Sequence, residues 1–365
     1  QPVRSEAEPL DYAVLPQLVD VVDKLVFAKA YARIYDGNAS VAVMHDGDTQ
    51  NNYSGQNAIV STMSGGHQEI GGTGTVSTMS GGSQSVKAGG TGTVSAMISG
   101  RQNIEDNGTI GIVITMSDEG QQVINLGGTG TVSTMNGGVQ MIDRGGIGTV
   151  DVMNSGIQGI NNGTGTVSTM NNGSQIVRAG GNGIVGTMEG GSQTISSGGN
   201  GTVVTMNSGW QNIDYGGTGT VSTMNGGQQT VKSGGAGTIG TMSSGMQEIS
   251  SGGMGTVITL NGGSQIISSG GTGTVSTMSG GQQSISSGGT GTVSTVSGGL
   301  QFIENGGGTI SSLLGGKQDI NGAGGTGTVS TMSGGTQYIN YGGMGTISTM
   351  NGGTQYLADG SGTIG

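Results

Sequence analysis

The residues best suited to chemistry are few in this chain, and their spacing does not gather them. The only histidines are His45 and His67, and neither has the neighbouring partners of a catalytic triad or a metal site. The chain has no cysteine, so no thiolate can act as a nucleophile or bind a metal. We therefore predict no enzyme activity, no catalytic residue, no metal site and no cofactor.

Carboxylates are the other candidate ligands. The densest acidic pair is Asp118 and Glu119, and Glu105 with Asp106 precedes it. Such a group can hold a cation weakly, but a solvated irregular turn is the simpler interpretation. The phrase GGTGTV is similar to calcium-binding toxin repeats yet lacks their aspartate, so we reject a calcium site of that kind.

The composition excludes an ordinary globular core and several classes of partner. There are 84 glycines, and charged residues make up 8% of the chain, where about 25% is usual. The net charge is −11, which excludes nucleic acid as a partner because a binding groove needs clustered Lys and Arg. No apolar run reaches the roughly 18 residues of a membrane helix.

A repeat of eighteen residues organises most of the chain. A glutamine recurs seventeen times from Gln68 to Gln355, mostly at eighteen-residue steps, and Gln50 marks a degenerate first copy. The residue two after each glutamine is always aliphatic, and the residue eight before it is always Val or Ile. Met almost always lies five before it. We expect these three columns to be buried and the glutamines to form a hydrogen-bonded ladder at a corner.

Two glycine clusters divide each repeat, for example Gly81-Gly82 and Gly89-Gly90. Glycine suits tight corners because it reaches positive φ without strain. Each repeat therefore predicts strand, corner, strand, corner, and stacking the repeats buries the apolar columns. We predict an all-β fold, a parallel β-helix (solenoid) of about seventeen rungs.

The first residues do not follow the repeat. Between Pro16 and Ala32, apolar residues recur at helical spacing, and Pro16 is placed to begin a helix. We assign residues 1–40 to an N-terminal cap or an export-related segment with a possible short helix. Residues 41–365 form the solenoid domain.

The repeat itself resembles a known family. The phrase GGTGTVSTMSGGSQSVKAGGTGTVS, residues 71–95, is similar to the repeats of the self-associating autotransporter adhesins of Gram-negative bacteria, of the AIDA and antigen-43 types. The matching elements are the paired glycine corners and the G-G-x-Q-x-aliphatic strand, over roughly residues 50–360.

This resemblance implies a right-handed β-helix passenger at the cell surface of a Gram-negative bacterium. Such passengers are exported through a C-terminal outer-membrane β-barrel, which this chain does not include. They promote bacterial aggregation by homotypic association, biofilm formation, and attachment to and invasion of host cells through a surface receptor.

The resemblance also implies a dedicated heptosyltransferase that modifies serines in short loops between strands. Either corner of the repeat offers such serines. We call the corner before the glutamine the first corner and the corner after it the second corner. The first-corner candidates are Ser64, Ser80, Ser83, Ser192, Ser264, Ser279, Ser297 and Ser333, and the second-corner candidates are Ser197, Ser251, Ser269 and Ser287.

Aromatic residues offer a second candidate surface for self-association. Phe302, Tyr338 and Tyr356 occupy the variable position directly after glutamine, which we expect to be exposed. Tyr215 and Tyr341 lie four residues after glutamine.

Three alternatives stay open. The chain fits a non-adhesive surface spacer. A carbohydrate-acting solenoid enzyme is weaker, because Lys87, Arg178 and Lys232 share a column but lie several rungs apart. Ice binding would use ranks such as Thr91-Gly-Thr93, but Ile147 and other residues interrupt them.

Overall fold

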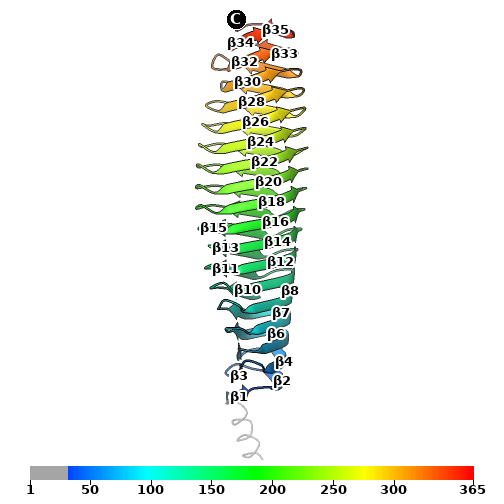
Figure 1. The fold of residues 1–365 in the computed structure, drawn as a ribbon, viewed down its shortest axis with the longest axis vertical. Coiled ribbons are helices and arrows are strands. Elements are labelled where there is room, and N and C mark those ends of the chain that lie inside the picture. The colour runs from blue at the N-terminus through cyan, green and yellow to red at the C-terminus, as the bar shows by residue number, and fades with distance from the viewer. Residues whose placement is uncertain (1–31) are drawn as a thin grey trace, which may run out of the picture.

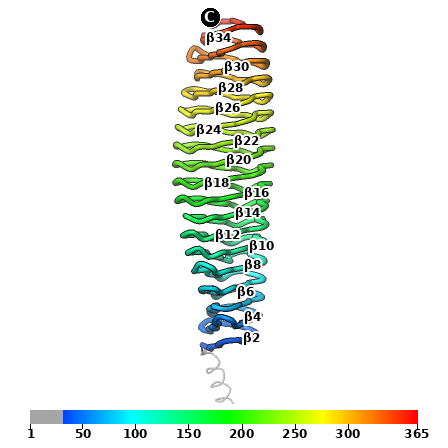
Figure 2. The backbone as a smooth tube through the Cα atoms, viewed as in Figure 1, coloured from blue at the N-terminus to red at the C-terminus, as the bar shows by residue number. Residues whose placement is uncertain are grey.

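The structure, a computed structural model, describes residues 32–365 as a parallel β-solenoid, which confirms the predicted fold class. Its rungs stack along one axis from the N-terminal to the C-terminal end (Figure 1). The backbone trace repeats the same path from rung to rung (Figure 2). The described residues contain no helix, and so none that could cross a membrane.

Each regular rung contains one long and one short strand. The long strands are β2 (Ser40–Met44), β4 (Asn57–Met63), β8 (Ile110–Met116), β10 (Thr129–Met135), β12 (Ile147–Met153), β14 (Thr164–Met170), β16 (Asn182–Met188), β18 (Asn200–Met206), β20 (Thr218–Met224), β22 (Ala236–Met242), β24 (Met254–Leu260), β26 (Thr272–Met278), β28 (Thr290–Val296), β30 (Gly307–Leu313), β32 (Thr326–Met332), β34 (Met344–Met350) and β36 (Ser361–Ile364).

The short strands contain the glutamines, apart from β1, which stacks on β3 at the N-terminal end. They are β1 (Ile34–Asp36), β3 (Thr49–Asn52), β5 (His67–Ile70), β9 (Gln121–Ile124), β11 (Val139–Asp143), β13 (Ile157–Asn161), β15 (Ser174–Arg178), β17 (Ser192–Ile195), β19 (Trp210–Ile213), β21 (Gln228–Val231), β23 (Met246–Ile249), β25 (Ser264–Ile267), β27 (Gln282–Ile285), β29 (Leu300–Glu304), β31 (Lys317–Asn321), β33 (Thr336–Ile339) and β35 (Thr354–Leu357).

Two further strands, β6 (Thr73–Val86) and β7 (Thr91–Ile104), run through both positions of their rungs. Long strands pair in parallel with long strands of the next rung, and short strands with short strands. Pairing is in register, so equivalent residues of successive rungs form columns. Of the predicted N-terminal segment, residues 1–31 with most of the possible helix lie outside the described residues, and Ile34–Asp36 forms β1.

The predicted apolar columns are buried. In β20, Val221 and Met224 are fully buried and belong to one core cluster that runs through the long strands. In β19, Ile213 belongs to a second cluster in the short strands. Strand alternation breaks between Val221 and Met224, where two consecutive residues face outward, so the long strand must bend there.

The glutamine ladder is confirmed, but it lies inside the solenoid and not at a corner. From Gln50 to Gln337 every glutamine of the column is fully buried. From Gln68 onward, each Nε2 donates to the Oε1 of the preceding rung at 2.6–2.7 Å, while Nε2 of Gln50 donates to the carbonyl of Ala39. Most Nε2 groups also approach a backbone carbonyl of a long strand, as Gln211 does with Gly201 at 3.4 Å. No buried side-chain polar atom among residues 32–365 lacks a partner.

One glycine in each rung has a role that the corner interpretation did not assign. It is the second residue of the long strand, and in β20 it is Gly219. A Cβ at this position would lie 2.3 Å from Cδ1 and 2.7 Å from Cγ1 of Ile213, and 2.9 Å from Oε1 of Gln211. The two strands therefore approach closely enough to leave room only for hydrogen. Ala58 and the equivalent Ala39 of the first rung are the exceptions, and the rung of Ala58 has Asn52 in place of the buried aliphatic residue.

We predict that Gly219→Ala lowers the local free energy of unfolding by about 1–3 kcal/mol, because overpacking forces Ile213 and Gln211 to shift. Amide hydrogen exchange of β18, β20 and β22 measures this local stability. The matched control is Ser222→Ala, an exposed position of the same strand, for which we expect a change within about 0.5 kcal/mol. Equal effects of the two substitutions would contradict the close approach.

Candidate functional site

The predicted first-corner serines occupy two different positions in the structure. Those directly after the buried methionine column are exposed, and Ser80 among them lies within the continuous strand β6. Those directly before the buried glutamine are half-buried. The exposed serines are Ser64, Ser80, Ser279, Ser297 and Ser333, and the half-buried serines are Ser83, Ser192 and Ser264.

Hydroxyls at both positions form hydrogen bonds. The Oγ of Ser83 lies 2.8 Å from Nδ1 of His67, and the Oγ of Ser192 donates to the Oγ of Ser174 at 3.2 Å. Among the exposed serines, Ser279 donates to Oδ1 of Asn261 at 2.7 Å. The two positions therefore differ in exposure and not in bonding, and the exposed hydroxyls are the more accessible to a modifying enzyme.

The second corner is a tight turn that presents its serines at the tip. Ser197, Ser251, Ser269 and Ser287 are all exposed. Ser251 has φ 51° and the following Gly252 has φ 75°, so both central residues of the turn have positive φ, as in a type I′ turn. The amide of Ser251 donates to the carbonyl of Ser269 one rung on, and that of Ser269 donates to Ser287, both at 3.1 Å. The corner serines are thus stacked at rung spacing on a hydrogen-bonded backbone.

Asparagine replaces serine at the first corner of several middle rungs. Nδ2 of Asn154 donates to Oδ1 of Asn136, and Nδ2 of Asn171 donates to Oδ1 of Asn154, both at 2.8 Å. These residues form an exposed amide ladder outside the buried one. The sequence showed the asparagines but not their mutual contacts.

The three aromatic residues directly after glutamine differ in exposure. The rings of Tyr338 and Tyr356 stack with centroids 4.3 Å apart, and Nζ of Lys317 lies 4.5 Å from the centroid of the Tyr338 ring. Tyr356 is exposed as expected, whereas Tyr338, covered by these neighbours, and Phe302 are half-buried. Loss of solvent and the neighbouring Tyr356 raise the pKa of Tyr338.

The outward face of the long strands contains the Thr-x-Thr ranks. Exposed apolar residues interrupt them, with Ile147 48%, Met254 57% and Met344 52% exposed. A surface that binds ice needs one flat, repeated pattern of groups, and these side chains break it.

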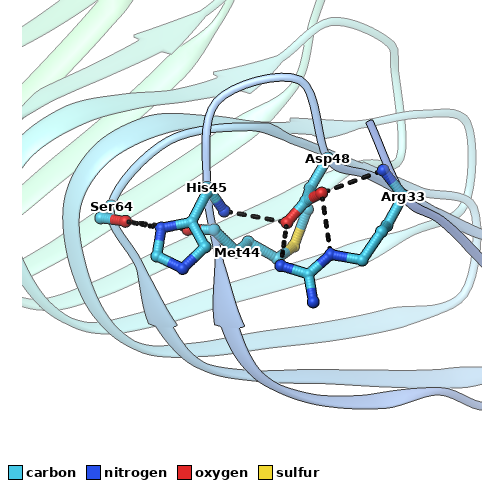
Figure 3. Close-up of polar contacts among 5 residues, drawn as sticks. All are labelled: Arg33, Met44, His45, Asp48 and Ser64. Atoms are coloured by element: carbon cyan, nitrogen blue, oxygen red, sulfur yellow. Dashed lines mark hydrogen bonds and ion pairs between the residues drawn. The ribbon is translucent and has the colours of Figure 1, made fainter. Parts of the chain in front are cut away.

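The histidines contact serines one rung away, which the sequence did not predict. The Oγ of Ser64 lies 3.1 Å from Nδ1 of His45 (Figure 3). Asp48 accepts a hydrogen bond from the backbone amide of His45 and not from its ring. The Ser64–His45 pair therefore lacks the carboxylate that would orient the imidazole in a catalytic triad.

No group of three or more His, Asp or Glu residues within residues 32–365 is arranged to hold a metal ion. Asp118 has φ 48° and lines a shallow recess with Glu119 and Arg101. Lys87 forms an ion pair with Glu105, and this hydrogen bond raises the pKa of Lys87. The predicted irregular acidic turns are thus solvated or paired.

Comparisons with known proteins add one observation. No protein-family model matches the chain, and no curated protein is significantly similar to it. Among solved structures, the chain is similar to the crystal structure of a TibC-catalysed, hyper-glycosylated fragment of TibA. The sequence identity is 24%, the match covers 91% of this chain and 99% of that chain, and the TM-score is 0.49. The placement of threonine and methionine in this repeat also resembles that of TibA. Similarity at this level leaves function to be argued from the chain's own residues.

Asp48, near the N-terminal end of the described residues, has a buried carboxylate that is 3% exposed. Its burial acts to raise its pKa, but amide donors from His45 and Arg33 and the Arg33 guanidinium, 3.2 Å from Oδ2, together hold that pKa below 3.8 (Figure 3). Because the folded-state pKa is lowered, Asp48 stabilises the first rungs above pH 3.8. This stabilisation is lost as the pH falls through the lowered pKa.

We predict that Arg33→Ala raises the pKa of Asp48, because burial then opposes ionisation with fewer compensating donors. A carboxyl-carbon NMR titration measures it directly. Arg33→Lys keeps the charge but loses the two-pronged contact, so its effect should be intermediate. An Asp48 pKa at or above 3.8 in the unaltered protein would contradict this account.

Proposed function

We propose that this chain is the surface-exposed passenger of a Gram-negative autotransporter adhesin that is O-heptosylated on its corner serines and associates with copies of itself. The observation that carries the proposal is the stacking of exposed serines at the corners of a regular solenoid. Such a rod presents accessible serines at both corners of many rungs, and the repeat resembles that of the adhesin family.

The proposed modification uses the hydroxyl groups of the corner serines. The Oγ of an exposed serine attacks the anomeric carbon of a nucleotide-diphosphate-activated heptose. The bond between that carbon and the diphosphate breaks, the nucleotide diphosphate leaves, and the hydroxyl proton is released. The acceptors are the exposed serines of both corners. Ser83, Ser192 and Ser264 are excluded because they are half-buried.

Sugars on the corners would suit this composition. Charged residues make up only 8% of the chain, so few side chains keep the surface hydrated. Rows of polar sugars would supply hydration and groups for contact between cells and with a host-cell receptor. Stacked Tyr338 and Tyr356, with Phe302 nearby, supply a protein surface that could contribute to self-association. A non-adhesive spacer is the second candidate, because the same rod would serve it without these surface groups.

We expect bacteria that display the chain with its heptosyltransferase to aggregate and settle. The intact mass of the chain should rise by multiples of one heptose residue, and peptide mapping should place the sugars on exposed corner serines. Replacing Ser251, Ser269 and Ser287 by Ala should remove three acceptors without unfolding the rod, since these side chains project into solvent.

The matched control replaces the half-buried Ser192 and Ser264 by Ala, which should leave the added mass unchanged. Cells that display a modified chain but do not aggregate would favour the spacer. An unchanged mass would contradict heptosylation and leave adhesion to the exposed protein side chains alone.

A further inference from the structure

The column of outward residues directly after the glutamine ladder changes character near the C-terminal end. In successive rungs it contains Ser284, Phe302, Asp319, Tyr338 and Tyr356. The two tyrosines cover one another. Phe302 instead has Ser284 and Asp319 on its two sides. These short side chains do not extend over its ring as a second aromatic residue would.

Shallow recesses therefore adjoin Phe302 on both sides along the solenoid axis. The recess toward the N-terminus has a volume of about 260 Å³ and is lined by Ser284 and Ser286. The recess toward the C-terminus has a volume of about 420 Å³ and is lined by Asp319, Asn321 and Tyr341. Phe302 and Glu304 line both recesses, so the two recesses flank these residues along the axis, and we call the pair of recesses the groove.

An irregularity in the repeat opens the larger recess. The step from Gln301 to Gln318 is 17 residues, and the step from Gln318 to Gln337 is 19 residues. The second corner is short in the first of these rungs and long in the next, so the ridge of corners is interrupted. Asn305 at the short corner accepts a hydrogen bond from the amide of Gly324 at the long corner, at 3.3 Å.

The groove combines aromatic surfaces with hydrogen-bonding groups. Tyr341 is 74% exposed and Glu304 is also exposed. Oδ1 of Asp319 accepts from Nδ2 of Asn321 at 3.1 Å and Oδ2 accepts from Lys317 at 2.7 Å, which holds the carboxylate in place. Carboxylate and amide groups retain lone pairs and donors for hydroxyl groups of a ligand.

Charge limits the class of ligand. Two carboxylates line the larger recess, while the nearby Lys317 is already paired with one of them and the chain carries a net charge of −11. Anionic ligands would be repelled. A ligand that offers apolar ring faces and many hydroxyl groups matches both the aromatic rings and the acceptors.

We propose that this groove binds a neutral oligosaccharide. Phe302 and Tyr341 stack on its sugar rings, and Glu304, Asp319 and Asn321 bind its hydroxyl groups. The inference rests on the proposed adhesin function and names the class of receptor that the adhesin binds. It assigns Phe302 to a ligand site, whereas the stacked Tyr338 and Tyr356 remain candidates for self-association.

The test uses residues 1–365 produced without a heptosyltransferase, so that no attached sugar can fill the groove. Neutral hexasaccharides of glucose, of mannose and of N-acetylglucosamine are titrated by calorimetry, with hexagalacturonate as the anionic control. We expect saturable binding of at least one neutral hexasaccharide and none of hexagalacturonate. Phe302→Ser and Tyr341→Ser should each weaken binding at least about tenfold. Both substitutions insert residues that the chain uses in the same columns, at Ser284 and Ser269.

The matched control is Tyr215→Ser, because Tyr215 occupies the same corner position as Tyr341, is 70% exposed, and lies far from the groove. It should bind as the unaltered chain does. Absence of binding to every neutral hexasaccharide would overturn the proposal, as would unchanged binding by Phe302→Ser and Tyr341→Ser. Loss of self-association in Phe302→Ser without any sugar binding would instead make the groove a protein interface. The titration uses purified protein and the aggregation assay uses cells. Failure of sugar binding and failure of the proposed adhesin function can therefore be distinguished.

Discussion

The structure depends on the need of each buried glutamine to find an amide partner one rung away. A primary amide in an apolar interior is costly unless both its donor and its acceptor are satisfied. In a column of identical amides at strand spacing, each NH₂ group donates to the carbonyl oxygen of the amide in the neighbouring rung, so every donor and acceptor has a partner. The steps between glutamines range from 16 to 20 residues, yet the N–O distance stays at 2.6–2.7 Å. The ladder therefore fixes the register of the rungs, and the corners absorb every insertion and deletion.

This constraint separates the positions that must repeat from those that are free to vary. The strands on either side of the ladder approach closely enough to require glycine opposite Ile213 and its equivalents, so the interior admits little change. Variation is confined to the corners and the outward faces. Serine, asparagine and aromatic residues alternate there without disturbing the core. A surface function, whether modification, self-association or sugar binding, can therefore diversify on a fixed rod.

Periodicity predicted the parts of this fold that every rung shares. The Val, Met and aliphatic columns are buried as expected, because a position that accepts only apolar residues lies in the core. The glutamine ladder was predicted, but at a corner, whereas the structure places it in the interior. The role of the glycine at the second position of the long strand, such as Gly219, was missed. It recurs in nearly every rung, but it was grouped with the corner glycines. Contacts between rungs, such as Ser64 with His45, could not be predicted because they depend on the exact course of irregular corners. The half-burial of Tyr338 likewise follows from its neighbours Tyr356 and Lys317 and not from its own position.

The most direct test of the central claim is hydrogen exchange of glutamine side-chain amides, followed by NMR on chain labelled only at glutamine. The ladder predicts slow exchange for the Nε2 protons of column members such as Gln122 and Gln283, which are fully buried. Their sequence neighbours Gln121 and Gln282 are exposed and half-buried, and should exchange fast as internal controls. Equally fast exchange of both sets would contradict a continuous buried ladder and, with it, the account of how the rungs keep register.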